Sequence, residues 1–271
     1  MNFVSGVLGN IIANILFWFG LGIVVWFVTG LSRRKFLHFF GLRDGVSLTV
    51  YLSNLWNVSA LPPPFTPKQG HAGATISMHE FRAAQAIARL FGGAPGRLPE
   101  LVSGLVDGVW VRRTVEPHIE VSSDVAAQKF ISTAAIIVGG GTRNPARANV
   151  VAAGLPYLVF DYEQAGSGQV GGNEGKVVIC RGSKIGEVVS QKLNLAIVEK
   201  IYDADRDATI FCCNGLRGDS SWGAVEYLCR HWRSLERKYG GRGFALCLGF
   251  PDQDSYMETY VEPRRLLSIP D

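Results

Sequence analysis

The stretch Ala134–Pro145, AAIIVGGGTRNP, has the greatest influence on the predicted fold. It opens with five apolar residues, the pattern of a strand that is covered on both faces of a sheet. Three glycines follow, and a helix-like stretch then runs to about Ala153. A buried strand that passes through glycines into a helix is the repeating unit of doubly wound α/β folds.

Residues 212–228, CCNGLRGDSSWGAVEYL, repeat this arrangement. Thr209–Cys213 is predicted as the buried strand and Ser220–Tyr239 as the helix. Asp219, Ser220 and Ser221 are residue types that cap helices, and Arg217 is expected to reach outward.

An earlier strand is predicted at Ser47–Leu52, and it ends in Ser53-Asn54. Ser77 and Glu80 have the spacing of a capping box, which starts a helix predicted over Met78–Phe91. Further strands are expected at Val109–Val121, Tyr157–Phe160, Lys176–Cys180, Leu195–Lys200 and Phe244–Phe250.

These elements predict an α/β fold after one N-terminal transmembrane helix: a Rossmann-like, mostly parallel or mixed sheet with helices on both faces. The hairpin-like region 156–202 indicates a mixed sheet or an inserted antiparallel edge. The polar tail after Pro251 is expected to be irregular.

The transmembrane helix is predicted within residues 1–31. No charged side chain occurs from Phe3 to Leu31, and the run is long enough to cross a hydrocarbon core of about 30 Å. Arg33, Arg34 and Lys35 follow directly, which predicts a single-pass inner-membrane protein with its N-terminus outside and its C-terminal domain cytoplasmic. A signal peptide and a buried core helix are the alternatives; the first would need basic residues before a shorter apolar run.

One side of this helix carries small and polar residues at a 4-3-4-3 spacing. Small residues let helices approach closely in lipid, and asparagine can bond across such an interface, so self-association or pore lining is expected. Alternatively, the asparagines lie near the headgroups and are hydrated. The residues of this stripe and its polar edge are Gly6, Asn10, Ala13, Asn14, Phe17, Gly20 and Val24.

Residues 32–46 form a basic-aromatic connector, and 47–271 form the cytoplasmic ligand-sensing domain. In the connector, Phe36, Phe39 and Phe40 are expected in the membrane interface while the basic residues meet anionic lipid.

The two glycine loops and the end of the first strand predict one shared cleft, because ligands of doubly wound sheets bind at the carboxyl ends of strands. Glycines let backbone N–H groups approach a ligand, and a helix start favours an anion. Neither loop is a Walker A motif or GxGxxG, and each has the plainer interpretation of a tight turn or a capped helix. The candidate ligand-binding residues are Ser53, Asn54, Gly139, Gly140, Gly141, Thr142, Arg143, Asn144, Gly215, Arg217, Ser220 and Ser221.

Signals for catalysis are weak. The five histidines are scattered, and neither HExxH nor GxSxG occurs. The five cysteines have no zinc spacing and fit a reducing cytosol, so no metal and no cofactor are expected. Glu80 and Glu226 are the carboxylates considered for acid–base work, although solvated carboxylates are commoner. The chain is therefore interpreted as a binding protein rather than an enzyme.

The pair IIVGGGTRN and NGLRGDSSWGAVE resembles the SLOG group of Rossmann-like domains, which includes LOG-type phosphoribohydrolases and nucleotide sensors. LOG-type enzymes carry a loop close to PGGxGTxxE, and Gly215, Gly218, Ser220 or Ser221, and Glu226 stand roughly in those places. The proline is missing and the glycines are spread apart, so the resemblance implies binding more than hydrolysis.

A transmembrane helix joined to such a domain looks like the effectors of bacterial antiphage signalling. That resemblance implies a homo-oligomer that binds a nucleotide-derived second messenger, such as a cyclic oligonucleotide, and then permeabilises the bilayer. No nucleic-acid polymer is expected as a partner. Two alternatives remain: a membrane-tethered hydrolase of nucleotides or nucleotide sugars, and a non-catalytic membrane scaffold.

Overall fold

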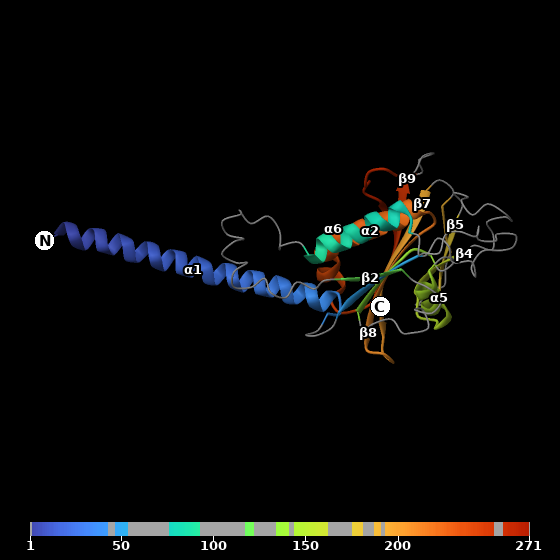
Figure 1. The fold of residues 1–271 in the computed structure, drawn as a ribbon, viewed down its shortest axis with the longest axis horizontal. Helices are drawn as coiled ribbons and strands as arrows, with labels where there is room; N and C mark the ends of the chain where they lie inside the picture. The colour runs from blue at the N-terminus through green and yellow to red at the C-terminus, as the bar shows by residue number, and fades with distance from the viewer. Residues whose placement is uncertain are drawn as a thin grey trace, which may run out of the picture.

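The fold is an α/β domain joined to one long helix (Figure 1), seen in a computed structural model. The first helix, α1 (Asn2–Phe39), extends away from the sheet, with the N-terminus at its far end. The structure describes residues 2–42, 47–53, 76–92, 117–121, 134–140, 144–161, 175–180, 187–190, 193–251 and 257–270.

A seven-stranded mixed sheet, in the order β10-β9-β7-β8-β3-β1-β2, forms the centre of the domain. Strands β1 (Leu48–Leu52), β2 (His118–Val121), β3 (Ala134–Val138) and β8 (Ala208–Gly215) are parallel neighbours. The mixed α/β class predicted from the sequence is therefore confirmed.

The other half of the sheet is antiparallel. Strand β7 (Leu193–Asp203) pairs antiparallel with both β8 and β9 (Phe244–Pro251), so the inserted strand is central rather than at an edge. Strand β10 (Arg264–Pro270) then pairs antiparallel with β9. The expectation of an irregular tail after Pro251 is wrong at β10, because backbone pairing to the edge of β9 makes a strand that has no apolar alternation of its own.

The hairpin-like region forms a second, three-stranded antiparallel sheet. It contains β4 (Leu158–Asp161), β5 (Gly175–Ile179) and β6 (Glu187–Ser190). Helix α5 (Pro145–Ala152) lies beside it, and Arg147 from this helix pairs with Glu199 of β7 at 3.0 Å in a fully buried ion pair. Glu199 also accepts hydrogen bonds from the N–H groups of Tyr157 and Leu158, which fixes the small sheet to the large one.

Helices cover both faces of the large sheet. Helices α2 (Met78–Gly92) and α6 (Gly218–Tyr239) pack with the end of α1 on the face that contains Val50, Ile136 and Phe211. Helix α5 and the small sheet cover the opposite face. Because neighbouring strand residues point to opposite faces, the unbroken burial of β1 and β3 shows that both faces of these strands are covered.

The start of α2 confirms the predicted capping box. The Glu80 N–H donates to Ser77 Oγ at 3.1 Å, and the Ser77 N–H donates to Glu80 Oε2 at 3.2 Å. Two backbone donors that a helix leaves unsatisfied at its first turn are thereby used, so α2 begins where the sequence predicts.

The C-terminal end of α1 belongs to the core of the domain. Phe39 and Phe40 are fully buried, and both rings contact Phe211 of β8, with centroids 5.3 Å and 5.0 Å away. Phe36 contacts Phe91 and Trp232 in the same cluster. The expectation that these three phenylalanines lie in a lipid interface is wrong, because the domain offers them aromatic partners. The connector continues the helix through Phe39.

The middle of α1 exposes apolar side chains in succession: Leu16, Phe17, Trp18 and Phe19 are each more than 60% exposed. The structure does not describe the side chains of residues 1–13, 15 and 24–29. Among the residues that it does describe, no helix has the length and hydropathy needed to cross a membrane. Of the predicted association stripe, Asn14 and Gly20 are exposed, whereas the structure does not describe the exposure of Gly6, Asn10 and Ala13.

Candidate functional site

Three strand ends meet at one edge of the large sheet, as the sequence predicts. Ser53 follows β1, Gly139 follows β3, and Gly215 ends β8; the parallel register places these carboxyl ends together. Direct bonds join them: Ser53 Oγ donates to the Val138 carbonyl at 3.3 Å, and the Gly139 N–H donates to the Cys213 carbonyl at 3.0 Å. This edge, which we call the carboxyl edge, is the candidate site.

Gly139 is at the point of closest approach. Its φ is +94°, a conformation that L-residues with side chains rarely adopt. A Cβ added there would lie closer than 3.0 Å to Ser53 Oγ and 3.2 Å from Glu80 Oε1. The glycine therefore lets the β3 loop pass beside the end of β1 and the start of α2.

Glu80 is the one of the two candidate acid–base carboxylates that lies at this edge. It is 5% exposed, and burial raises the pKa of its carboxyl, although hydrogen bonds from Ser53 and Ser77 oppose that shift. Glu226 lies two turns into α6, where its carboxylate accepts from Arg230 Nε at 3.3 Å. Only Glu80 is thus placed near the glycine loops.

Asn144 joins the β3 loop to its neighbours. The side chain is fully buried, and its amide group donates to the carbonyls of Tyr51 and Val138 while its oxygen caps α5 by accepting from the Ala146 N–H. Because both amide hydrogens are used within the protein, this residue positions the loop instead of presenting a donor to a ligand.

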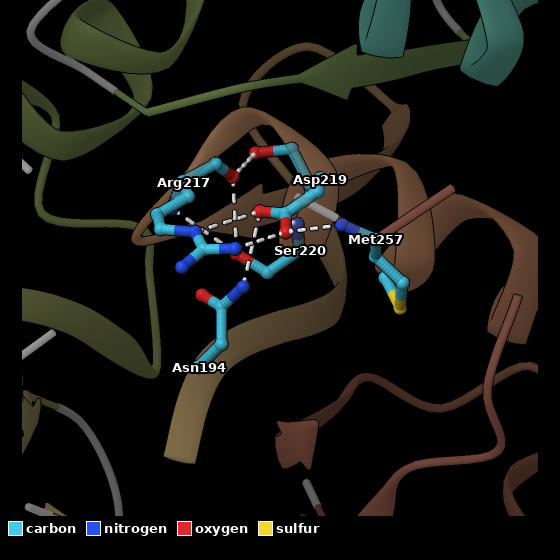
Figure 2. Close-up of polar contacts among 6 residues, drawn as sticks. Asn194, Arg217, Asp219, Ser220 and Met257 are labelled. Atoms are coloured by element: carbon cyan, nitrogen blue, oxygen red, sulfur yellow. Dashed lines mark hydrogen bonds and ion pairs between the residues drawn. The ribbon is translucent and has the colours of Figure 1, made fainter. Parts of the chain in front are cut away.

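The N-terminus of α6 contains a compact polar cluster, drawn in Figure 2. Asp219 is 1% exposed and lies at its centre. Its Oδ1 accepts from Asn194 Nδ2 at 3.0 Å and from the Ser220 N–H at 2.9 Å, and its Oδ2 accepts from the Met257 N–H at 3.1 Å. Burial alone would raise the pKa of this carboxyl, but the hydrogen bonds from Arg217, Met257 and Asn194 hold the pKa below its usual value.

Arg217 does not reach outward, so that expectation is wrong. Its guanidinium turns back and pairs with both oxygens of Asp219 (Figure 2). A nearby buried carboxylate attracts the guanidinium more strongly than water does. The predicted capping is confirmed for Ser220, whose Oγ accepts from the Arg217 N–H at 3.1 Å, while Ser221 Oγ donates to the Arg217 carbonyl.

Helices α2 and α6 touch where both begin. A Cβ on Gly218 would lie 3.3 Å from His79 of α2, and the His79 ring stacks on Trp222 with centroids 6.4 Å apart. Burial lowers the pKa of His79, and the charge of Asp219 partly offsets this effect. Sequence reasoning missed His79 and Asn194, because neither lies in a glycine loop. The signal available for Asn194 was its polar side chain at the start of a buried strand.

Four predicted site residues, Asn54, Gly141, Thr142 and Arg143, lie outside the described residues, and their roles stay predictions. Gly140 is described and half-buried beside them. Across the residues that the structure describes, no group of three His, Cys, Asp or Glu side chains is placed to hold a metal ion.

The carboxyl edge combines the starts of three helices, α2, α5 and α6, with glycine backbone that is buried at Gly139 and Gly215 and half-buried at Gly140 and Gly218. Helix starts carry partial positive charge and favour anions. At α6 the charge is already matched by Asp219, and at α2 by Glu80. The start of α5 is capped by the neutral Asn144 amide and has no acidic residue in its first turn, so an external anion would meet no carboxylate there.

Comparisons of the chain with protein-family models, with curated proteins and with solved structures gave no match.

Proposed function

We propose that this protein is a membrane-anchored, ligand-responsive effector, whose cytoplasmic α/β domain binds a nucleotide-derived second messenger in the manner of SLOG-like sensors. The proposal includes self-association of the α1 helices and permeabilisation of the bilayer, as in antiphage signalling. The observation that carries it is the meeting of β1, β3 and β8 at one edge, with Gly139 in a conformation that brings the loop backbone close to Ser53.

The ligand class follows from the chemistry of that edge. A phosphate group fits the start of α5, where the helix dipole favours an anion and where Arg143 directly precedes the N-cap residue Asn144 in the sequence. Ser53 and Gly140 are next to this position along the edge. A ligand with two or more phosphates joined by nucleosides could contact the ends of β1 and β3 at once, which supports a nucleotide over a simple anion.

The membrane anchor is supported by the character of α1. Leu16, Phe17, Trp18 and Phe19 are consecutive and exposed, so apolar groups face every side of the helix. A helix that is apolar all round needs an apolar environment on all sides, and lipid tails supply one. Self-association through the stripe of small residues rests on spacing alone.

Helices α2 and α6 offer a route from ligand to anchor. Both begin at the carboxyl edge, where His79 and Trp222 stack, and both contact α1 further along, where Phe36 touches Phe91 of α2 and Trp232 of α6. A ligand that binds one arrangement of these helices more tightly than another would shift the equilibrium between arrangements of α1.

The test is ligand-induced thermal stabilisation of the whole chain in lipid nanodiscs. The whole chain is needed because Phe39 and Phe40 of α1 are part of the core. The panel contains cyclic oligonucleotides, cyclic mononucleotides, ADP-ribose derivatives and nucleoside triphosphates. A ligand at 100 times its Kd should stabilise the fold by about 2.7 kcal/mol.

The expected result is stabilisation that Arg143→Ala abolishes and Arg264→Ala, a change at an exposed arginine of β10, leaves intact. The ligand should be recovered unchanged. A flat panel with folded protein would refute the sensor and leave a scaffold role. Stabilisation by inorganic phosphate equal to that by every nucleotide would refute the nucleotide class.

A second candidate, a tethered hydrolase of nucleotides, is favoured by one observation: the buried Glu80 carboxyl, with its raised pKa, lies beside Ser53 and Gly139. Burial shifts this carboxyl toward its protonated form, which is the form that a general acid uses. Consumption of the stabilising ligand by the wild-type chain, lost in Glu80→Gln without loss of binding, would establish this function.

A further inference from the structure

Two separate segments place positive charge on the end of the domain that α1 enters. One segment is the last part of α1, and the other is the C-terminal half of α6 with the turn after it. The exposed cations are Arg34, Lys35, Arg233, Arg237, Lys238 and Arg242, which together we call the basic end.

Aromatic packing brings the two segments together. The rings of Phe36 and Trp232 meet edge to face with centroids 4.9 Å apart, and the Arg233 guanidinium lies 5.2 Å from the Trp232 ring. Two residues beyond Phe36, His38 lies against Gly241, where a Cβ would be 3.0 Å from its ring. Figure 1 shows α1 leaving the domain on the side where α6 lies.

The charge of the basic end is largely uncompensated. Within the described part of the chain, none of its six cations has a carboxylate partner. Glu236 is the one acidic residue in positions 229–243. An excess of this kind attracts a polyanion or an anionic surface.

We infer that the basic end is a docking surface for anionic lipid headgroups, an inference that rests on the proposed membrane anchorage. Phe36 lies five residues beyond Leu31, the end of the predicted span, which is about 8 Å along a helix axis. The Debye length at physiological ionic strength is also about 8 Å, so Arg233, beside the Trp232 ring that contacts Phe36, lies within reach of the surface potential. Arg237 lies one helical turn further along the same side of α6. Docking would hold α6, and with it α2, at a set angle to the bilayer.

Lipid is favoured over nucleic acid by position. The anchored helix brings the basic end to the membrane on every molecule, whereas a nucleic acid would have to enter the space between the domain and the bilayer. Each Lys or Arg near an anionic leaflet strengthens attachment by about fivefold. Reversing one charge removes one attraction and adds one repulsion, so the ratio of docked to undocked domain should fall by about 25-fold.

The experiment uses energy transfer from a dye on the domain to acceptor-labelled lipid. The full chain is reconstituted into liposomes of phosphatidylcholine, with or without 30% phosphatidylserine, and outward-facing domains are labelled at Cys180, the exposed cysteine, with an impermeant maleimide. Transfer is expected to change with phosphatidylserine and to return to its starting value in 0.5 M salt.

Arg237→Glu should lower the ratio of docked to undocked domain by about 25-fold and so reduce the response, while Arg264→Glu, which reverses an exposed charge near the carboxyl edge, should preserve it. Carbonate extraction, run in parallel, reports anchorage separately. A chain that resists extraction but ignores phosphatidylserine overturns the docking surface and leaves the anchor standing, whereas a chain that carbonate extracts overturns the anchor. Binding of a DNA duplex without a phosphatidylserine response would assign the basic end to nucleic acid and also overturn the inference.

Discussion

Replacing Gly139 by alanine tests the geometry of the carboxyl edge most directly. Two costs are expected. The first is backbone strain, because a non-glycine residue at φ +94° costs about 1–2 kcal/mol. The second is overlap, because the new Cβ would come closer than 3.0 Å to Ser53 Oγ, and overpacking of a well-packed site costs about 1–3 kcal/mol. Gly139→Ala should therefore destabilise the domain by about 2–5 kcal/mol.

The two costs can be measured separately. Gly154 also has a positive φ, +67°, but a Cβ there would meet nothing within 4 Å, so Gly154→Ala reports strain alone. In Gly139→Ala/Ser53→Ala the hydroxyl that blocks the new methyl group is gone, and part of the loss should be recovered. The expected coupling between the two sites is about 1–3 kcal/mol.

The assay is urea denaturation of the full chain in nanodiscs, followed by tryptophan fluorescence. Four variants are compared at constant m-value: Gly139→Ala, Gly154→Ala, Ser53→Ala and the double variant. If Gly139→Ala cost no more than Gly154→Ala, the close approach of the β1 and β3 ends would be refuted. If the double variant showed no coupling, Ser53 would not be the group in contact.

Three further changes address the buried charges. Asp219→Asn should cost about 2–4 kcal/mol in denaturation, because Arg217 loses its buried partner, while the exposed Asp205→Asn should stay within about 0.5 kcal/mol. Arg147→Met should lower the free energy of unfolding by about 3–5 kcal/mol, because it leaves the buried Glu199 carboxylate unpaired. The double variant Arg147→Met/Glu199→Met should lower it by less, and equal losses in the two variants would contradict this reasoning. Burial lowers the pKa of Lys200 from 10.5, its value in an unfolded chain, to about 8. Between these pH values the unfolded state binds more protons than the folded state, so the free energy of unfolding should rise by about 3 kcal/mol. Lys200→Met should remove this rise.

The strands of the parallel half could be predicted from the sequence because their signal is local. The apolar run at Ala134–Val138 matches β3 residue for residue, and the capping box at Ser77 and Glu80 sets the start of α2. Both patterns arise from chemistry within a few residues, so no knowledge of distant partners is needed.

The partners of charged and aromatic side chains could not be predicted in the same way. Arg217 was expected in solvent, but its guanidinium pairs with the buried carboxylate of Asp219. That carboxylate is held in place by hydrogen bonds from Asn194 and Met257, which are distant in sequence. The central position of β7 likewise depends on two long-range antiparallel pairings that leave no local trace. Phe39 and Phe40 follow a basic cluster, as interfacial residues do, and only the tertiary structure shows that they enter the core.

This burial has a mechanical consequence for the proposed effector. Because Phe39 and Phe40 both contact Phe211 of β8, and Phe40 also contacts Phe91 of α2, α1 cannot change its angle to the domain without repacking the core. Packed cores shift between discrete arrangements and resist continuous deformation. A ligand at the carboxyl edge would therefore act on the anchor only by moving α2 and α6 together with α1. Reorganisation of whole domains within an oligomer is the mode of signalling that this arrangement favours, over bending of one helix within a protomer.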